Sequence, residues 1–170
     1  MSVLNIIKIG HPTLRKIAKP VEKFDQNLEK LVLDMVETMR LNDGIGLAAP
    51  QVNVSKRLFV IDKKLINEEW EAGAYINPKI LKADGSNILE EGCLSIPNIR
   101  ADVDRPFKIE VEYQTLKGEK VREEMDDLLA RVFQHEFDHL EGVLFVDKIS
   151  ILKKKLLEPQ LKEIEQIYTY

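Results

Sequence analysis

Residues 134–139 read Gln134-His135-Glu136-Phe137-Asp138-His139, and the stretch before them carries apolar side chains at helical spacing. Those apolar positions are Leu128, Leu129, Val132 and Phe133, and they predict a helix from about Met125 to Leu140, which Gly142 is placed to end. Positions i and i+4 of a helix lie on one face, so His135 and His139 can bind the same metal ion. Glu136 falls at the edge of that face, where a general base would stand.

The His-Glu-x-x-His pattern also has a simpler interpretation, in which it arises by chance and its histidines are ordinary helix residues, one packed and one solvated. The chain contains only three histidines, the third being His11. Two of these three histidines stand at the spacing of metal ligands on a helix, which random placement of three histidines does not explain. The sequence therefore predicts a metal site on this helix.

The segments outside this helix predict an α+β fold. A second amphipathic helix is expected from about Asp25 to Leu41, and a third over residues 150–168, bending or restarting at Pro159. The strand-like stretches between the first two helices are Leu58–Ile61, Ala74–Leu81, Asn87–Glu90, Ile109–Tyr113 and Glu119–Glu123, with turns at Asp84-Gly85-Ser86 and Lys117-Gly118. Because these strands are bunched, we expect short antiparallel sheets, connected by hairpins and packed around the central metal-binding helix.

Length and composition indicate one globular domain spanning residues 1–170, because a chain that is 44% hydrophobic at this length can bury a substantial core. The net charge of -4 argues against a protein that coats nucleic acid, and no specific DNA binding is expected. No apolar run reaches the ~18 residues of a membrane span, and no secretory signal pattern opens the chain. The single cysteine, Cys93, cannot form an internal disulfide, so a reducing, cytoplasmic location is expected.

Cys93 is the candidate for a third metal ligand. A catalytic site of the zinc type takes three protein ligands and keeps an open position for water. Cys93 lies in Glu91-Gly92-Cys93-Leu94-Ser95, a glycine-marked turn after a predicted strand. A thiolate binds such ions strongly, whereas the alternative is a cysteine that serves as a small buried hydrophobe. The residues alone leave both interpretations open.

A further segment reads Gly44-Ile45-Gly46-Leu47-Ala48-Ala49-Pro50-Gln51. Its glycines let the backbone lie against a ligand, and Gln51 could donate a hydrogen bond to an oxyanion. On composition alone, a flexible loop between a helix and a strand is the stronger interpretation.

Taken together, these three segments resemble the signature segments of peptide deformylase in their order and spacing. The resemblance extends to His11-Pro12-x-Leu14-Arg15, covers nearly the whole chain, and is closest to the bacterial branch with a short Glu-Gly-Cys-Leu-Ser segment. It implies a single catalytic domain that hydrolyses the N-formyl group from the N-terminal formyl-methionine of newly made polypeptides and releases formate. The roles it implies are metal binding by Cys93, His135 and His139, base catalysis by Glu136, and oxyanion binding by the Gln51 side chain and the Leu94 backbone N–H.

Substrate contacts are expected around this centre. Ile45, Leu128 and Val132 are candidate walls of an apolar pocket for the methionine side chain, although core packing explains them equally well. The other candidates, from the resemblance, are Gly46, Gly92 and, as a contact to the substrate backbone, Arg100.

Glu91 and Arg105 align with a pair that is structural in the family and would brace the Cys93 turn. A solvated surface role is the alternative for this pair.

The expected cofactor is one divalent metal ion. A Cys/His/His ligand set with an open position suggests zinc by its chemistry. The resemblance instead implies Fe2+ as the physiological ion, with Zn2+, Ni2+ or Co2+ able to occupy the same site.

Two alternative functions stay open from the sequence. A zinc peptidase would take its third ligand from a downstream carboxylate such as Glu158 or Glu163, although Pro159 makes that helix awkward. A catalytically inactive relative would only bind a ligand, but Glu136 and Gln51 would then have no purpose.

The expected partners are N-formylmethionyl peptides as substrates, with no membrane. The terminal segment that contains Lys153-Lys154-Lys155 and Lys162 could contact the ribosome transiently through its phosphates. The alternative for these lysines is the solvated face of a terminal helix.

Overall fold

The computed structural model describes residues 2–168 and has the predicted α+β architecture. Its α-helices are α1 (Gln26–Leu41), α2 (Asp127–Leu140) and α3 (Ile151–Ile167). Its strands are β1 (Gly46–Ala48), β2 (Leu58–Ile61), β3 (Gly73–Asp84), β4 (Asn87–Cys93), β5 (Ile96–Arg105), β6 (Lys108–Gln114) and β7 (Lys120–Asp126). Within residues 2–168, three short 3-10 turns connect these elements, and a fourth, Pro12–Arg15, precedes α1.

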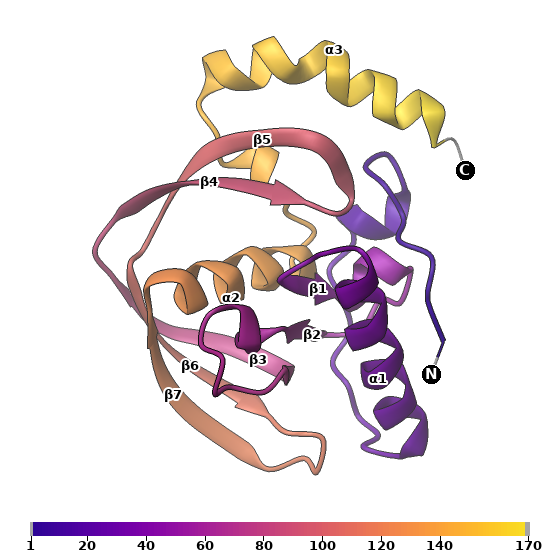
Figure 1. Ribbon diagram of the computed structural model, residues 1–170, viewed down its shortest axis with the longest axis vertical. Coiled ribbons are helices and arrows are strands. Elements are labelled where there is room, and N and C mark those ends of the chain that lie inside the picture. The colour runs from indigo at the N-terminus through magenta and orange to yellow at the C-terminus, as the bar shows by residue number, and fades with distance from the viewer. Residues whose placement is uncertain (1, 169–170) are drawn as a thin grey trace.

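The strands form two antiparallel sheets with α2 between them. The larger sheet has the order β1-β2-β3-β6-β7, and the smaller one is the hairpin of β4 and β5. Figure 1 shows α2 in the middle, with the β4–β5 hairpin on one side and the larger sheet on the other. The prediction of antiparallel sheets packed around a central helix is therefore confirmed.

An aromatic cluster fixes α2 against the larger sheet. Phe133 of α2 meets Phe59 of β2 edge to face, with 4.9 Å between ring centroids, and meets Tyr75 of β3 at 5.4 Å. Phe59, Tyr75 and Phe133 are almost completely buried. Burial of such rings is a large favourable contribution to folding, so the position of α2 is set by its apolar face.

The ends of α2 follow from local chemistry. Gly142 has a φ of 72°, a left-handed conformation that suits glycine just after a helix. The Val143 N–H donates to the Asp138 carbonyl at 2.9 Å, which closes the last turn. Gly142 thus ends α2 two residues after Leu140, as its place in the sequence predicted.

Helix α1 lies beside the larger sheet and begins within one residue of its predicted start. The Asp25 side chain caps it by accepting a hydrogen bond from the Leu28 N–H at 3.0 Å. Its buried side chains include Val32, Met35 and Met39, which pack in one cluster with residues of β1 and β2. This packing places the β1 segment that follows α1 next to α2.

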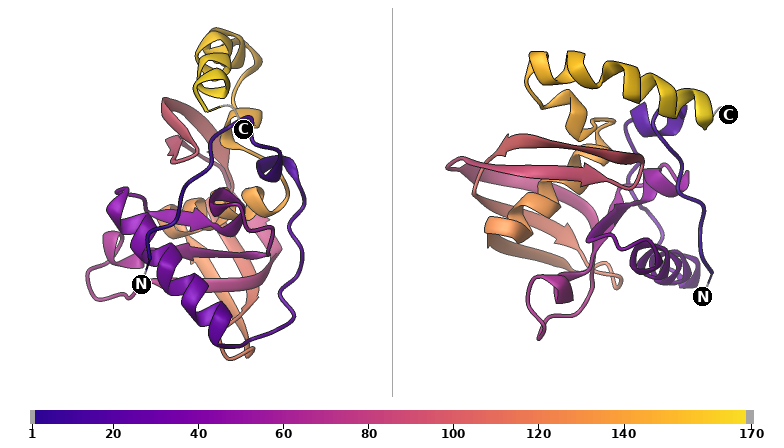
Figure 2. Two further views of the ribbon diagram at one scale, coloured as in Figure 1. Left: turned by 90° about the vertical axis from the view of Figure 1, so that its right-hand side faces the viewer. Right: turned by 45° about the horizontal axis from the view of Figure 1, so that its top comes forward.

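Helix α3 lies along β5 at the edge of the molecule (Figure 2). Its buried residues Leu157, Leu161 and Ile164 pack with Ile96 and Ile99 of β5. The expected restart at Pro159 is wrong, because α3 runs through this residue as one helix, whereas the expected bend stays a prediction. Apolar residues on both sides of Pro159 pack on the same surface, which holds the two halves together.

The predicted strand structure misses two strands and assigns one hairpin wrongly. β1 and β5 were not predicted, because β1 has only three residues and β5 alternates buried positions with charged ones that disfavour strands. The turn at Asp84-Gly85-Ser86 does not close a hairpin: β3 pairs with β2 and β6, whereas β4 pairs with β5. The turn at Lys117-Gly118 does join a hairpin, of β6 and β7.

Candidate metal centre

Three side chains from two elements converge at one point between α2 and the β4–β5 hairpin. Cys93 is the last residue of β4, where the pairing with β5 shifts register before the turn. His135 and His139 lie one turn apart on α2. One potential ligand atom from each of the three lies within 4.8 Å of the others, and within residues 2–168 no other group of three such side chains does this.

The His135 ring is held by a buried carboxylate. Its Nδ1 lies 2.8 Å from Oε1 of Glu91, two residues before Cys93 on β4. Burial alone would lower the pKa of His135, but hydrogen bonds with Cys93 and Glu91 raise it well above its ordinary value. Because Nδ1 donates to Glu91, Nε2 becomes the ligand nitrogen once its proton leaves, so this contact sets the orientation of the ring.

Glu91 in turn is held by two buried arginines. Arg105 of β5 donates to both carboxylate oxygens, at 2.6 and 3.0 Å, and Arg131 of α2 donates to Oε2. Burial alone would raise the pKa of Glu91, but hydrogen bonds from His135 and Arg105 lower it to about 2. Because Arg105 is only 3% exposed, the alternative of a solvated Glu91–Arg105 pair is wrong.

His139 lies deeper than His135 and is 1% exposed. Its Nε2 lies 3.4 Å from Sγ of Cys93. Burial and the nearby charge of His135 hold the pKa of His139 well below its ordinary value, so the ring stays neutral and can bind a metal. Its Nδ1 has no hydrogen-bond partner among the described residues.

Glu136 lies beside the two histidines, almost fully buried. Its Oε2 is 4.0 Å from Nε2 of His135. Burial raises the pKa of Glu136 to about 7, against the opposing attraction of His135. A carboxyl group with this pKa can accept and return a proton near neutral pH.

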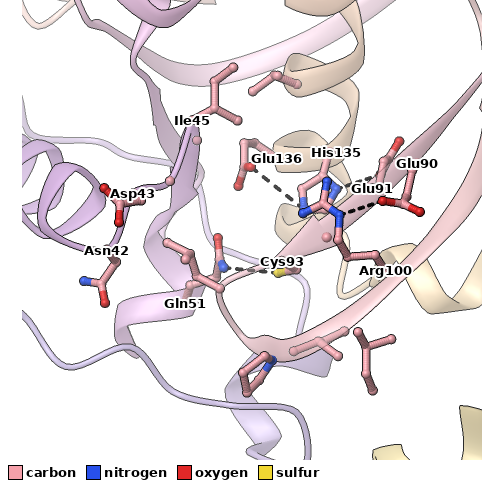
Figure 3. A pocket seen from close by; sticks show the side chains of 18 of the residues that line it. Asn42, Asp43, Ile45, Gln51, Glu90, Glu91, Cys93, Arg100, His135 and Glu136 are labelled. Atoms are coloured by element: carbon pink, nitrogen blue, oxygen red, sulfur yellow. Dashed lines mark hydrogen bonds and ion pairs between the residues drawn. The ribbon is translucent and has the colours of Figure 1, made fainter.

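Gln51 approaches the centre from the opposite side, as Figure 3 shows. It belongs to the 3-10 turn Ala49–Val52 that follows β1, and its Oε1 accepts a hydrogen bond from the Ala48 N–H at 2.9 Å. Its Nε2 therefore faces the centre, 3.4 Å from Sγ of Cys93 and 3.1 Å from Oγ of Ser95.

A cavity of about 640 Å³ opens beside this centre and reaches solvent. All the residues predicted to contact substrate line it: Ile45, Gly46, Gly92, Arg100, Leu128 and Val132. Cys93, Leu94, Gln51, His135 and Glu136 line it as well. The structure thus brings the predicted site residues together around one cavity and the candidate metal centre.

Sequence reasoning missed several groups at the site. Arg131 lines the cavity and donates to Glu91, and Ser95 accepts from Gln51. Arg131 stands four residues before His135, so helical spacing alone could have placed it on the same face. Lys8, in the extended N-terminal segment, also lines the cavity, and no motif in the sequence around it pointed to the site.

Comparison with known proteins agrees with this geometry. The family model described as polypeptide deformylase matches residues 3–155. The chain belongs to this family. The peptide deformylase of Thermotoga maritima is 52% identical over 156 residues, which are 91% of this chain and 92% of that protein. The relative from Phenylobacterium zucineum is 42% identical over 167 residues, 98% of this chain and 97% of its own length.

Solved structures of family members share the fold. The crystal structure of peptide deformylase from Thermotoga maritima has a TM-score of 0.84 at 50% identity and covers 88% of this chain and 99% of that one. The peptide deformylase structure from Legionella pneumophila has a TM-score of 0.89 at 40% identity, with coverage of 98% and 97%. The family is metal-dependent, and Cys93, His135 and His139 offer the sulfur and nitrogen donors that such an ion prefers.

No helix within residues 2–168 is both long enough and apolar enough to span a lipid bilayer.

Proposed function

We propose that this chain removes the formyl group from the N-terminal formyl-methionine of newly made polypeptides by metal-dependent hydrolysis, releasing formate. The observation that carries the proposal is the convergence of a Cys/His/His ligand set, a buried carboxylate and a fixed amide donor on one cavity. Family membership supports the same reaction. The products are formate and a free α-amino group.

Cys93, His135 and His139 would hold the metal ion. When bound, the ion supplies positive charge that acidifies water and polarises the formyl carbonyl. The burial of His139 and the Glu91 contact to His135 support this assignment, because burial keeps the His139 ring neutral and the Glu91 contact orients the His135 ring with its Nε2 toward the centre.

Glu136 would accept the proton of the attacking water and pass it to the leaving amine as the C–N bond breaks. Its pKa of about 7 suits both steps, since the group can gain and lose a proton at neutral pH. Its Oε2 lies 4.0 Å from Nε2 of His135, which is close enough for the carboxylate to reach a water bound at the centre.

The Gln51 amide and the Leu94 backbone N–H would stabilise the negative charge that forms on the formyl oxygen when water attacks the formyl carbon. The Ala48 N–H holds the Gln51 oxygen, which leaves the amide N–H groups to face the cavity. One such donor contributes roughly 3 to 4 kcal/mol to transition-state stabilisation.

The methionine side chain would lie among Ile45, Leu128 and Val132. Leu128 is 38% exposed and Val132 is 5% exposed, so this wall runs from the cavity mouth into the interior. Gly92 and Arg100 also line the cavity, and the peptide backbone would pass along them. We further propose that residues 1–170 act as one catalytic domain.

Formate release from formyl-Met-Ala-Ser by the metal-loaded protein tests the function. Acetyl-Met-Ala-Ser is the control substrate, because a deformylase should leave it intact. Glu136→Gln should retain the metal and lose turnover. Absence of turnover by the metal-loaded wild-type protein would leave a ligand-binding relative without catalysis as the better explanation.

The physiological metal is proposed to be Fe2+. Intrinsic affinity favours Zn2+ over Fe2+ for this ligand set, so affinity alone does not select iron. Anaerobic purification with elemental analysis, followed by kcat for the Fe2+, Zn2+, Ni2+ and Co2+ forms, tests the proposal. A zinc form with the highest kcat would overturn it.

We also propose that the enzyme works in the cytoplasm and contacts the ribosome transiently through α3. Its lysines 153 and 155 are exposed, whereas Lys154 pairs with Asp147 at 3.6 Å and Lys162 with Glu158 at 3.9 Å. Lys153→Glu/Lys155→Glu should weaken co-sedimentation with ribosomes, and added salt should weaken it for the wild type. Lys64→Glu/Lys117→Glu, which changes exposed lysines outside α3, is the control. Equal co-sedimentation of both double variants with ribosomes would contradict a contact through α3.

A further inference from the structure

Gly46 of β1 lies directly against the side chain of Glu136. A β-carbon built on Gly46 would be 2.6 Å from Oε2 of Glu136, 2.9 Å from its Cγ and 3.0 Å from its Cδ. Real side chains essentially never approach at the shortest of these distances, and all three atoms belong to one side chain. The Glu136 side chain therefore occupies the space that a side chain at position 46 would need.

The glycine at this position is required by space and not by backbone conformation. The described glycines with left-handed φ values are Gly10, Gly85, Gly118 and Gly142. Gly46 is not among them, so its backbone is one that an alanine can adopt without strain.

The β1 backbone cannot yield easily at the contact, so an added methyl group would move the Glu136 carboxylate. Gly46 pairs with Ile61 of β2, and the next residues, Leu47 and Ala48, are completely buried. Glu136 is 3% exposed on α2, and its Oε1 has no hydrogen-bond partner among the described residues. Hydrogen bonding to Oε1 thus does not orient this carboxylate, whereas the wall formed by β1 limits where it can lie.

We propose that Gly46 is a positioning residue for catalysis, whose missing side chain lets the Glu136 carboxylate lie at the distance from the metal centre that proton transfer requires. This inference rests on the proposed role of Glu136 as the base, and it replaces a direct substrate contact as the reason for glycine at position 46. Adding one methyl group would displace the carboxylate while leaving Cys93, His135 and His139 in place.

Gly46→Ala in the metal-loaded protein tests the proposal. Because a misplacement of about 1 Å can cost roughly 100-fold in rate, kcat for formyl-Met-Ala-Ser should fall about 100-fold, with KM and metal content unchanged. Gly73→Ala is the matched control: Gly73 pairs with the same Ile61 from the other side, and its β-carbon would meet Lys63 and Tyr75. This control should keep the wild-type kcat.

A double-mutant cycle with Glu136→Asp separates positioning from a general structural effect. The shorter aspartate relieves the contact with an alanine at position 46, so Glu136→Asp should cost about tenfold less in kcat in the Gly46→Ala protein than in the wild type. If Gly46→Ala alone lowers metal content, recovery of metal and kcat in the double variant supports the proposal, and lack of recovery overturns it.

The remaining outcomes are distinct. Wild-type kcat in Gly46→Ala, a rise in KM alone, or independent effects of the two substitutions would overturn the positioning role. Wild-type protein that is inactive when metal-loaded would instead refute the proposed function.

Discussion

Helices α2 and α3 both have an apolar face, yet they meet different surroundings. In α2, nine of 14 residues are buried, including Arg131, Gln134, Glu136 and His139. In α3, three of 17 residues are buried, all apolar, and its polar side chains face solvent. Figure 1 shows the cause, since α2 lies between two sheets and α3 lies on one side of a hairpin.

The difference explains why the site is on α2. A buried polar group must find a partner, shift its pKa or bind a ligand, because desolvation is costly. His135 and Arg131 find Glu91, the pKa of Glu136 rises, and His139 and Cys93 are available to an ion. On α3 the lysine, glutamate and glutamine side chains remain solvated, and a pair such as Glu158–Lys162 contributes at most a few tenths of a kcal/mol.

The largest effect is expected from removal of a ligand to the α2 centre. Cys93→Ala should abolish metal binding and turnover. This loss is larger than the roughly 100-fold fall in affinity or activity that follows when a residue that only orients a metal ligand is changed. Glu163→Ala on α3 should leave both unchanged. Metal content after dialysis, measured with formate release, checks the pair. The reverse pattern would restore the peptidase interpretation with a carboxylate ligand from α3.

Next in size is the loss of the carboxylate that orients His135. Glu91→Gln removes the buried counter-charge of Arg131 and leaves Arg105 with only its ion pair to Asp138, so we expect a cost of about 3 to 5 kcal/mol in the free energy of unfolding. Metal affinity should also fall about 10- to 100-fold. Denaturant unfolding and metal titration measure the two effects. Glu158→Gln, on α3, is the control and should change neither by a measurable amount.

The contribution of Glu91 should also depend on pH. Its pKa is about 2 in the folded protein and 4.5 ordinarily, so the ionised form is favoured by folding. The stabilisation is complete above pH 4.5 and is lost as pH falls toward about 2. The difference in unfolding free energy between wild type and Glu91→Gln should therefore shrink over this range. A difference that stayed constant from pH 6 to pH 3 would contradict the assigned ion pair.

The smallest effects are expected within α3 itself. Leu161→Ala removes a side chain that packs with β5, and because the helix is peripheral we expect a loss near the lower end of the roughly 2 to 5 kcal/mol range. Leu156→Ala, at a position that is 66% exposed, should change stability by less than about 0.5 kcal/mol. Thermal unfolding of the two variants compares them. Equal losses of stability in the two variants would mean that α3 packs against more of the protein than its described contacts show.

Neither α3 substitution is expected to change kcat for formyl-Met-Ala-Ser, because α3 contributes no residue to the cavity. A fall in kcat in the Leu161→Ala protein would show that the docking of α3 on β5 influences the Cys93 end of the hairpin.

The sequence by itself determined the elements whose signals are local. The period of the apolar residues located α1 and α2 to within about two residues, and the spacing of His135 and His139 determined that two imidazoles share one face. Asp25 and Gly142 marked helix ends because capping depends on neighbouring residues only. The types of candidate metal ligand were also readable, since ligand chemistry belongs to the side chain.

Only the tertiary structure decided which distant residues meet. Turn residues at Gly85 suggested a hairpin, but the partner of a strand is chosen by packing over the whole sheet, so β3 and β4 separated into two sheets. That separation brings Cys93 and Glu91 across to α2 and buries Arg105 and Arg131 with them. The contact of Gly46 with Glu136 joins residues 90 positions apart, and it arises from volume exclusion, which local periodicity does not encode.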